Sequence, residues 1–415
     1  MWLLVGCMPV LAAPDNEQQT SLIPSPSPTA TIVRPPGYLL PPTATPWPSP
    51  TPQATPTRTP APTSTPLGYL TPIPKLIQVG PDLYPADVNP LTGLTLDEPA
   101  IMNRRPLAVK VTNFPRSTRP QAGLMKADLV YEYYVEWGMT RFIALYYGQD
   151  GSKVGPVRSG RFFDEHIVRM YDALFAFKSA DRRVLEPWLE SDLLTRLIIP
   201  RTDAYGCPPI CQEGAAFNYN GYYADTSEMA NFAIRRGADN NRYDQRGMFF
   251  QSITPWGGSP ALTVNTRYSR FSYNTWTYNP DTTRYERSAE SEDEVEGVQT
   301  LIPLYDKLTN ERVAADNVIV LYVPHTYYVK TNTTEMVKIH LLGSGPAKVF
   351  RDGQGYDTVW MRVGETDPLL IFRNDAANTP FPLKPGNTFF QVIGSTSDLE
   401  VQDSLAEWRF QFDIP

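Results

Sequence analysis

The strongest structural signal in the chain is the segment Ala-Asp-Leu-Val-Tyr-Glu-Tyr-Tyr-Val-Glu-Trp, residues 127–137. Its polar and apolar side chains alternate as in a β-strand, where neighbouring residues point to opposite faces of the sheet. Residues 140–147 form the expected partner strand, because glycine first in a Gly138-Met139 turn favours type II′. This register places Arg141 opposite Glu136 as a cross-strand ion pair. Since both faces carry bulky apolar groups, we expect helices to cover both.

The segments around this hairpin predict a domain in which strands and helices interleave. Apolar residues recur at helical spacing after residue 161, and Ser159 is placed to cap that helix. Strands are expected at residues 107–111 and 173–177, and helices at residues 162–171, 184–194 and 227–235. The first globular part is therefore of the mixed α/β type.

From about residue 243 the pattern changes to short strands between turns, for example at residues 317–323 and 389–393. We therefore predict an α+β protein, with an N-terminal mixed α/β domain followed by a mainly β C-terminal domain. A disordered Pro/Thr-rich stalk precedes both. The predicted parts are a truncated lipoprotein signal with its lipidation site, a linker, the α/β domain and the β domain, at residues 1–20, 21–81, 82–242 and 243–415.

Composition excludes several classes of protein. The chain has 415 residues and a formal net charge of -7, which argues against a nucleic-acid partner because phosphates require a surplus of Lys and Arg. No apolar run approaches the roughly 20 residues that a membrane-spanning helix needs. The three histidines are scattered, so we expect no metal site, and no motif indicates a cofactor. The acidic run at residues 290–294 lacks the ligand pattern of a calcium loop and is expected to be a solvated loop.

The predicted stalk is rich in proline. Residues 24–74 hold 17 of the 42 prolines, and only Arg34 and Arg58 carry charge there. Such a segment has too little apolar area to repay ordering, and proline favours an extended form of about 3.1 Å per residue. Its upper reach is on the order of 150 Å. It is interpreted as a disordered spacer, with an O-glycosylated stalk as the alternative.

The amino end contains Leu4-Val5-Gly6-Cys7, which resembles the lipobox of bacterial lipoproteins. The resemblance implies cleavage before Cys7 and attachment of a diacylglyceryl group to its sulfur. Six residues are too few for a signal peptide, so we expect the true start to lie upstream of Met1. The alternatives are a chance match in a cytoplasmic protein and ordinary cleavage near residues 11–13.

Cys207 and Cys211 lie four residues apart in Cys-Pro-Pro-Ile-Cys. Once Cys7 is set aside, they form an even pair, which in an oxidising compartment predicts a small local disulfide. A redox couple is the alternative, although the usual Cys-x-x-Cys spacing is missing. Zinc is disfavoured because two thiolates leave a tetrahedral site half empty.

The best candidate for a binding site is the loop that contains Arg158, Ser159 and Arg161. It precedes a predicted helix, whose amino end attracts anions, and two guanidinium groups can bind an anion bidentately. Arg119 and Gln121, in a loop bounded by proline, are expected to join them. The structural alternative is that these arginines neutralise nearby carboxylates at residues 128, 132, 164 and 165.

Two carboxylates are weak catalytic candidates, Asp128 and Glu132. Glu132 and Glu136 share one face of the predicted strand, but their spacing is too long for a glycosidase pair. Glu132 is set among apolar neighbours, and a buried carboxylate must be paired or have a raised pKa. The structural interpretation is an ion pair with an arginine of residues 158–161.

Several uncommon strings occur together in this chain. They are Arg119-Pro120-Gln121-Ala122-Gly123, Ala127-Asp128, Val130-Tyr131-Glu132, Gly155-Pro156-Val157-Arg158-Ser159, Phe350-Arg351-Asp352-Gly353 and Pro385-Gly386. In these strings the chain resembles the YerB-type bacterial lipoproteins, a family with a two-part domain of unknown function. The resemblance covers roughly residues 90–394, and it implies a lipid-anchored protein on the extracytoplasmic face of the cell membrane.

No sequence motif compels an enzyme, so two functions remain open. The preferred one is a non-catalytic module that binds a cell-wall polymer or an envelope protein. The alternative is a hydrolase or transferase that acts on a wall glycan, with Asp128 or Glu132 as the acid or base.

Overall fold

The structure is a computed structural model that describes residues 77–200, 207–214 and 218–415. The predicted lipidation site at Cys7 and nearly all of the predicted stalk lie outside the described residues. Among the described residues, no helix combines the length and the apolar character needed to cross a lipid bilayer. The N-terminal region is mixed α/β and the C-terminal region is mainly β, as the sequence predicts.

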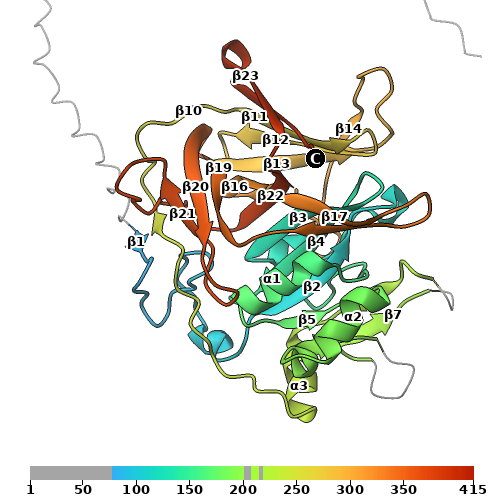
Figure 1. Ribbon diagram of the computed structural model, residues 1–415. Coiled ribbons are helices and arrows are strands. Elements are labelled where there is room, and N and C mark those ends of the chain that lie inside the picture. The colour runs from blue at the N-terminus through green and yellow to red at the C-terminus, as the bar shows by residue number, and fades with distance from the viewer. Residues whose placement is uncertain (1–76, 201–206, 215–217) are drawn as a thin grey trace, which may run out of the picture. The chain divides into compact units, whose positions relative to one another are not determined.

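The largest sheet has 11 strands and is shared by both halves of the chain (Figure 1). Its centre is β22, which pairs in parallel with β16 on one side and with β3 on the other. The strands are, in spatial order, β10 Ser259–Pro260, β20 Gln354–Arg362, β19 Gly343–Arg351, β16 Asn317–Val323, β22 Thr388–Gly394, β3 Leu129–Glu136, β4 Met139–Tyr146, β2 Leu107–Thr112, β5 Leu174–Ala176 and β6 Leu197–Ile198, with β21 Leu370–Arg373 beside β20. The domain boundary at residues 242–243 stays a prediction.

A second sheet of 7 strands consists of C-terminal residues only. Its order is β14 Leu301–Pro303, β13 Arg284–Glu290, β12 Ser272–Asn279, β11 Thr263–Ser269, β24 Glu407–Gln411 and β23 Asp398–Gln402, with β15 Ala314–Ala315 beside β13. Three two-stranded pairs complete the strands: β1 Gln78–Val79 with β9 Phe250–Gln251, β7 Ile210–Gln212 with β8 Tyr222–Ala224, and β17 His325–Lys330 with β18 Glu335–Ile339.

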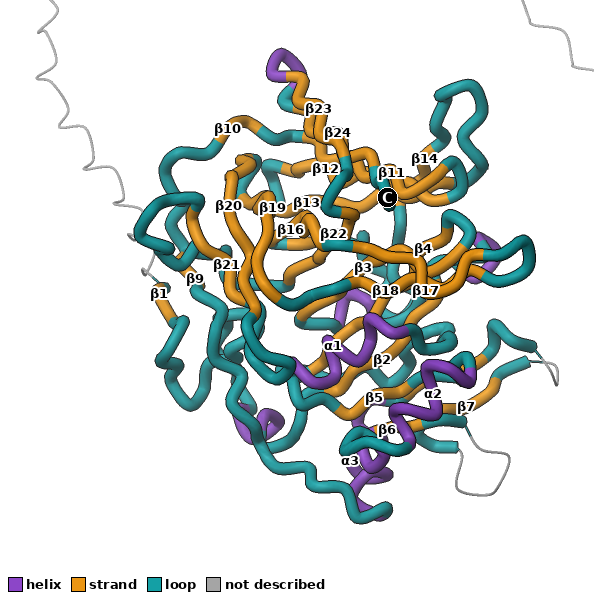
Figure 2. Tube along the Cα trace, in the orientation of Figure 1, coloured by secondary structure: helices purple, strands orange, loops and turns teal. Residues whose placement is uncertain are grey.

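In the part of the N-terminal region that the structure describes, there are three α-helices: α1 Phe162–Met170, α2 Arg182–Leu189 and α3 Thr226–Arg235 (Figure 2). Short 3-10 turns occur at Pro99–Met102, Arg116–Thr118, Leu124–Lys126, Leu194–Arg196 and Asp403–Leu405. All three predicted helices are present, but the one predicted at residues 184–194 ends at Leu189, and Ser159 does not cap α1. The N-cap is Arg161, whose backbone N–H donates to the Asp164 carboxylate at 2.8 Å. Helix α2 begins earlier than predicted because Asp181 accepts a hydrogen bond from the Arg183 backbone.

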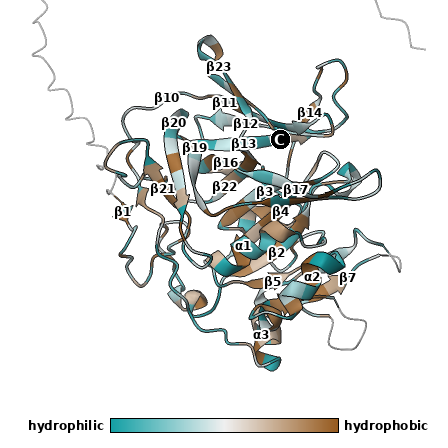
Figure 3. Cartoon of the chain, viewed as in Figure 1, coloured by the Kyte–Doolittle hydropathy of each residue, from teal (hydrophilic) through white to brown (hydrophobic). Residues whose placement is uncertain are grey.

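The two faces of β3 are covered by different layers. Tyr131 and Tyr133 pack on Phe163 of α1, with ring centroids 6.4 and 4.4 Å apart. The opposite face meets the second sheet, where Arg287 Nη2 of β13 lies 2.7 Å from Glu132 Oε2 of β3. Figure 3 shows the hydrophilic side of α2 turned towards the viewer. The expectation that helices cover both faces is therefore right for one face and wrong for the other.

The β3–β4 hairpin differs from the prediction in register. Its two turn residues are Trp137 and Gly138, with φ of 52° and 78°, so the turn has the positive φ values of type I′. Arg141 lies opposite Tyr133, and the register shifts between Tyr134 and Glu136. This β-bulge explains why Glu132 faces the second sheet whereas Glu136 reaches α1, although strict alternation would place both on one face.

Candidate functional site

The loop at residues 157–160 lies between the carboxyl-terminal half of β2 and the segment that follows β5, a strand parallel to β2. Val157 bridges to Val111, and the Gly160 N–H donates to the Ser179 carbonyl at 2.8 Å. In open α/β sheets, ligands bind at the carboxyl ends of parallel strands. The position of this loop in the fold thus agrees with a role in binding.

Four cations surround this loop: Arg141, Arg158, Arg161 and Lys178, here called the arginine cluster. Arg141 Nη2 lies 3.1 Å from Glu136 Oε1, and Arg161 Nη2 contacts the same oxygen. Arg158 forms no ion pair with any carboxylate of the described residues. Its Nε donates instead to the Thr112 hydroxyl at 3.2 Å.

The arginine cluster carries a surplus of positive charge. Within the described part of the chain, Glu136 is the one carboxylate that forms ion pairs with it. Burial and the nearby Arg161 charge lower the pKa of Arg141 to about 9 and also lower the pKa of Arg158. Burial and the Arg158 charge lower the pKa of Lys178. Since like charges are held together without matching carboxylates, a bound anion would stabilise the cluster.

Ser159 holds the backbone of the loop in place. Its carbonyl accepts hydrogen bonds from Arg141 at 2.9 Å and from Arg161 at 3.4 Å. Its hydroxyl lies 3.0 Å from that of Ser179, at the exposed side of the loop. Two hydroxyl groups therefore accompany the cations at the surface.

A buried ion pair lies beneath the cluster. Lys110 Nζ is 3.1 Å from Asp164 Oδ1, and both side chains are fully buried. Burial lowers the pKa of Lys110 to about 7. Because Asp164 occupies both Lys110 and the Arg161 N–H, an outside anion would depend on the guanidinium groups more than on the helix end.

The remaining predicted ligand-binding residues lie apart from the cluster, between the two sheets. Arg119 Nη2 forms an ion pair with Glu290 Oε1 at 2.7 Å, and Gln121 Nε2 donates to the Thr112 carbonyl at 3.1 Å. Both side chains are almost completely buried. Glu290 begins the acidic run at 290–294 but is only 1 % exposed, so the prediction of a solvated loop is wrong for this residue.

Glu132 belongs to the same buried network. Its Oε2 accepts from Arg287 Nη2 of β13 at 2.7 Å, and both side chains are fully buried. Asn113 and Thr140 donate to its Oε1 at 3.0 and 2.8 Å. The predicted partner within residues 158–161 is therefore wrong, because the second sheet covers this face of β3. The alternative that these arginines neutralise residues 128, 132, 164 and 165 is also wrong, because Arg161 pairs with Glu136, Arg119 pairs with Glu290, and Arg158 forms no ion pair with a carboxylate of the described residues.

Asp128 lines a cavity of about 510 Å³, together with Asp316 and Arg284. Its carboxylate accepts hydrogen bonds from the Gly148 backbone at 3.1 Å and from the Asn89 amide at 2.9 Å. Burial raises the pKa of Asp128 to about 6, and burial also raises the pKa of Asp316. Unlike Glu132, Asp128 thus combines a cavity with a perturbed carboxyl group.

The sequence carries no local signal for Lys178 in the arginine cluster or for Arg287, the buried partner of Glu132. Lys178 is a lone lysine after a short strand, and it reaches the loop only because β5 pairs with β2. Arg287 lies 155 residues from Glu132 along the chain. Neither Lys178 nor Arg287 can be assigned to its place without knowing which strands pair.

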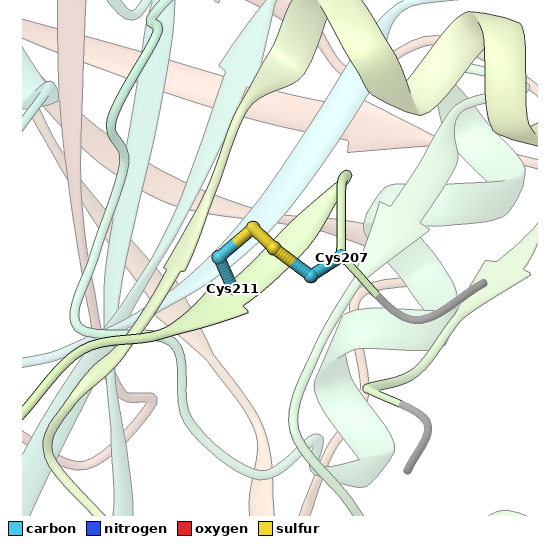
Figure 4. Close-up of a disulfide and its surroundings, with 2 residues drawn as sticks. All are labelled: Cys207 and Cys211. Atoms are coloured by element: carbon cyan, nitrogen blue, oxygen red, sulfur yellow. A yellow bond between two sulfur atoms is a disulfide. The ribbon is translucent and has the colours of Figure 1, made fainter. Parts of the chain in front are cut away.

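Cys207 and Cys211 are joined by a disulfide, with Cα atoms 4.8 Å apart (Figure 4). The bond closes the turn that leads into β7. It therefore constrains a surface segment and takes no part in the arginine cluster.

Comparison with known proteins identifies related chains. Residues 91–233 match the description "Protein of unknown function (DUF3048) N-terminal domain", and residues 264–390 match the corresponding "C-terminal domain". The chain is 27% identical over 332 residues to "Putative lipoprotein YerB" of Bacillus subtilis (strain 168), which covers 73% of this chain and 85% of that protein. The crystal structure of the Bacillus subtilis YerB protein has a similar fold, with a TM-score of 0.59, 23% identity, and coverage of 74% of this chain and 96% of that one.

Proposed function

Because the chain belongs to the DUF3048 family, whose N-terminal and C-terminal domains it carries in order, we propose that it is a lipid-anchored envelope protein that binds an anionic cell-wall polymer. The arginine cluster is the binding site in this proposal. Its surplus of positive charge, with Glu136 as the shared partner, is the observation that carries it.

The proposed anchor rests on the sequence around Cys7 and on the relationship to a protein named as a putative lipoprotein. Mass spectrometry of the protein isolated from its own cells tests it. We expect a mature chain that begins at Cys7 and carries a diacylglyceryl group. An unmodified Cys7 in a cytosolic fraction would contradict the anchor.

Binding is tested by retention of the purified protein on isolated wall material. Arg158→Ala and Arg161→Ala are each expected to weaken binding about tenfold, because a hydrogen bond to a charged group contributes roughly 1.5–3 kcal/mol. Affinity should also fall as salt rises, since the contacts are ionic. Arg409→Ala is the control, as Arg409 lies on β24 with its side chain 48% exposed. Equal retention of all variants would remove the arginine cluster as the site.

A second candidate function rests on Asp128. A cavity lined by a carboxyl group with a pKa of about 6 is the arrangement expected of a general acid or base. In this alternative the protein is a hydrolase or transferase that acts on a wall glycan. Release of soluble fragments from wall material by the wild type, abolished in Asp128→Asn, would support it; turnover that survives the substitution would not.

A further inference from the structure

A second cavity lies beside the arginine cluster. It has a volume of about 370 Å³ and is enclosed by α1, α2 and the β17–β18 hairpin. Ring-bearing and polar side chains line it, among them Phe162, Glu165, Arg183, Trp188, Tyr328 and Lys338. Its volume falls within the range of about 300–1,000 Å³ that is typical of small-molecule sites.

Aromatic rings form much of the cavity wall. Tyr328 is 44% exposed, and its ring centroid lies 5.0 Å from that of Phe162 in an edge-to-face arrangement. Trp188 is buried, and its Nε1 donates to Glu165 Oε2 at 3.0 Å. Lys338 Nζ stands over the Tyr328 ring, and the part of the ring that stays exposed offers an apolar surface to a ligand that is otherwise hydrophilic.

Polar groups surround the aromatic rings. Lys338 Nζ lies 4.6 Å from the Tyr328 ring centroid, and the Arg183 side chain is 41% exposed. His340 Nε2 lies 2.8 Å from the Thr326 hydroxyl at the exposed edge. These groups can donate hydrogen bonds to hydroxyls or anionic oxygens, whereas Glu165 can accept them.

The cavity and the arginine cluster share one loop. Arg161 of the cluster is followed directly by Phe162 of the cavity wall. A side chain at Gly160 would come within 2.9 Å of the Trp188 ring, so the loop backbone lies directly on that ring. A linear ligand that contacts the guanidinium groups can therefore continue into the cavity.

We propose that this cavity holds a sugar ring of the polymer whose anionic groups the arginine cluster binds, an inference that rests on the proposed function. The C–H face of the sugar packs on the part of the Tyr328 ring that Lys338 leaves exposed. Lys338, Arg183 and Glu165 hydrogen-bond its hydroxyl groups. The ligand class is a wall polyanion that carries sugar rings, and the cavity distinguishes it from a polyanion without them.

Two polymers test this inference on the full chain: poly(glycerol phosphate), and the same polymer substituted with N-acetylglucosamine. We expect the wild type to bind the substituted polymer about fivefold more tightly, because only that polymer can pack a sugar ring against Tyr328. Tyr328→Ala should lose this preference and retain its affinity for the unsubstituted polymer. Tyr328→Phe keeps the ring and should keep the preference. Tyr305→Ala is the control, because Tyr305 is 48% exposed outside the cavity.

The outcomes separate the inference from the proposed function. Equal binding of both polymers by the wild type would overturn the sugar site and leave the arginine cluster standing. If neither polymer binds to the wild type, both the sugar site and the arginine cluster are overturned. Loss of affinity for the unsubstituted polymer in Tyr328→Ala, with thermal unfolding unchanged, would also overturn the sugar site, because the ring would then act on the anionic contacts.

Discussion

The Glu132–Arg287 ion pair joins the two sheets at a position where neither side chain reaches solvent. We expect Arg287→Met to lower the free energy of unfolding by about 3–5 kcal/mol, because it leaves a buried carboxylate without its charged partner. Urea denaturation followed by tryptophan fluorescence measures the change.

The double variant Glu132→Gln/Arg287→Met is the control for this pair. It removes both charges, so most of the lost stability should return. A double variant as unstable as Arg287→Met would show that packing, and not the unpaired charge, causes the loss.

His325 makes the protein sensitive to acid. Burial lowers the pKa of His325 from its ordinary value of 6.5 to about 4, so the unfolded chain binds a proton that the folded chain excludes. Its contribution to stability is therefore present above about pH 6.5 and is lost as the pH falls towards 4. We expect His325→Phe to flatten the decline in urea midpoint between pH 7 and 4.5. An unchanged pH dependence in this variant would contradict the assignment.

Asp128 changes the stability of the fold with pH in the opposite direction to His325. Burial raises its pKa to about 6, so its contribution to stability is present below about pH 4 and is lost as the pH rises through 6. Asp128→Asn removes this opposing effect. The same urea series should show a steeper acid decline in Asp128→Asn than in the wild type, and a flatter decline would refute the raised pKa.

At the scale of elements, the β3–β4 turn depends on two positive φ values. A Cβ atom at Gly138 would come within 2.6 Å of the Ser269 hydroxyl oxygen. We expect Gly138→Ala to lower the free energy of unfolding by about 1–3 kcal/mol. Trp137 also has positive φ, so Trp137→Asn should be more stable than Trp137→Ala by about 0.5–1 kcal/mol. The reverse order of the two Trp137 variants would argue against a type I′ turn.

Local periodicity was sufficient to predict helix α1 and strand β16, because each buries one continuous pattern of apolar residues. The β3–β4 register was not predictable from alternation. Glycine at residue 138 fits either central position of a two-residue turn, and a bulge near Val135 breaks the period-two rule.

At the scale of the whole molecule, the central strand β22 ties the two sequence halves together. One edge of β22 forms hydrogen bonds with β3, and the other edge forms hydrogen bonds with β16. We therefore expect residues 77–242, expressed alone, to lack a cooperative unfolding transition. Mixing them with residues 243–415 should restore it, as circular dichroism can show. Cooperative unfolding of the first fragment by itself would mean that the shared sheet is not required for its stability.

The candidate site follows from the sequence only in part. Arg158, Ser159 and Arg161 could be singled out because they stand together before a helix. Lys178 and Arg141 join them through strand pairing, and the cavity beside Tyr328 depends on a hairpin that begins more than 150 residues later. No local sequence pattern encodes these contacts between distant segments. They nevertheless determine which class of ligand the arginine cluster and the cavity can bind.

The position of β22 also sets the order of events during biosynthesis. A ribosome that makes this chain adds β22 after every other strand of the 11-stranded sheet. Until then β3 and β16 lack the strand that lies between them, so the nascent polypeptide cannot close its main sheet. The main sheet can therefore form only after the last of its strands in the sequence has been made.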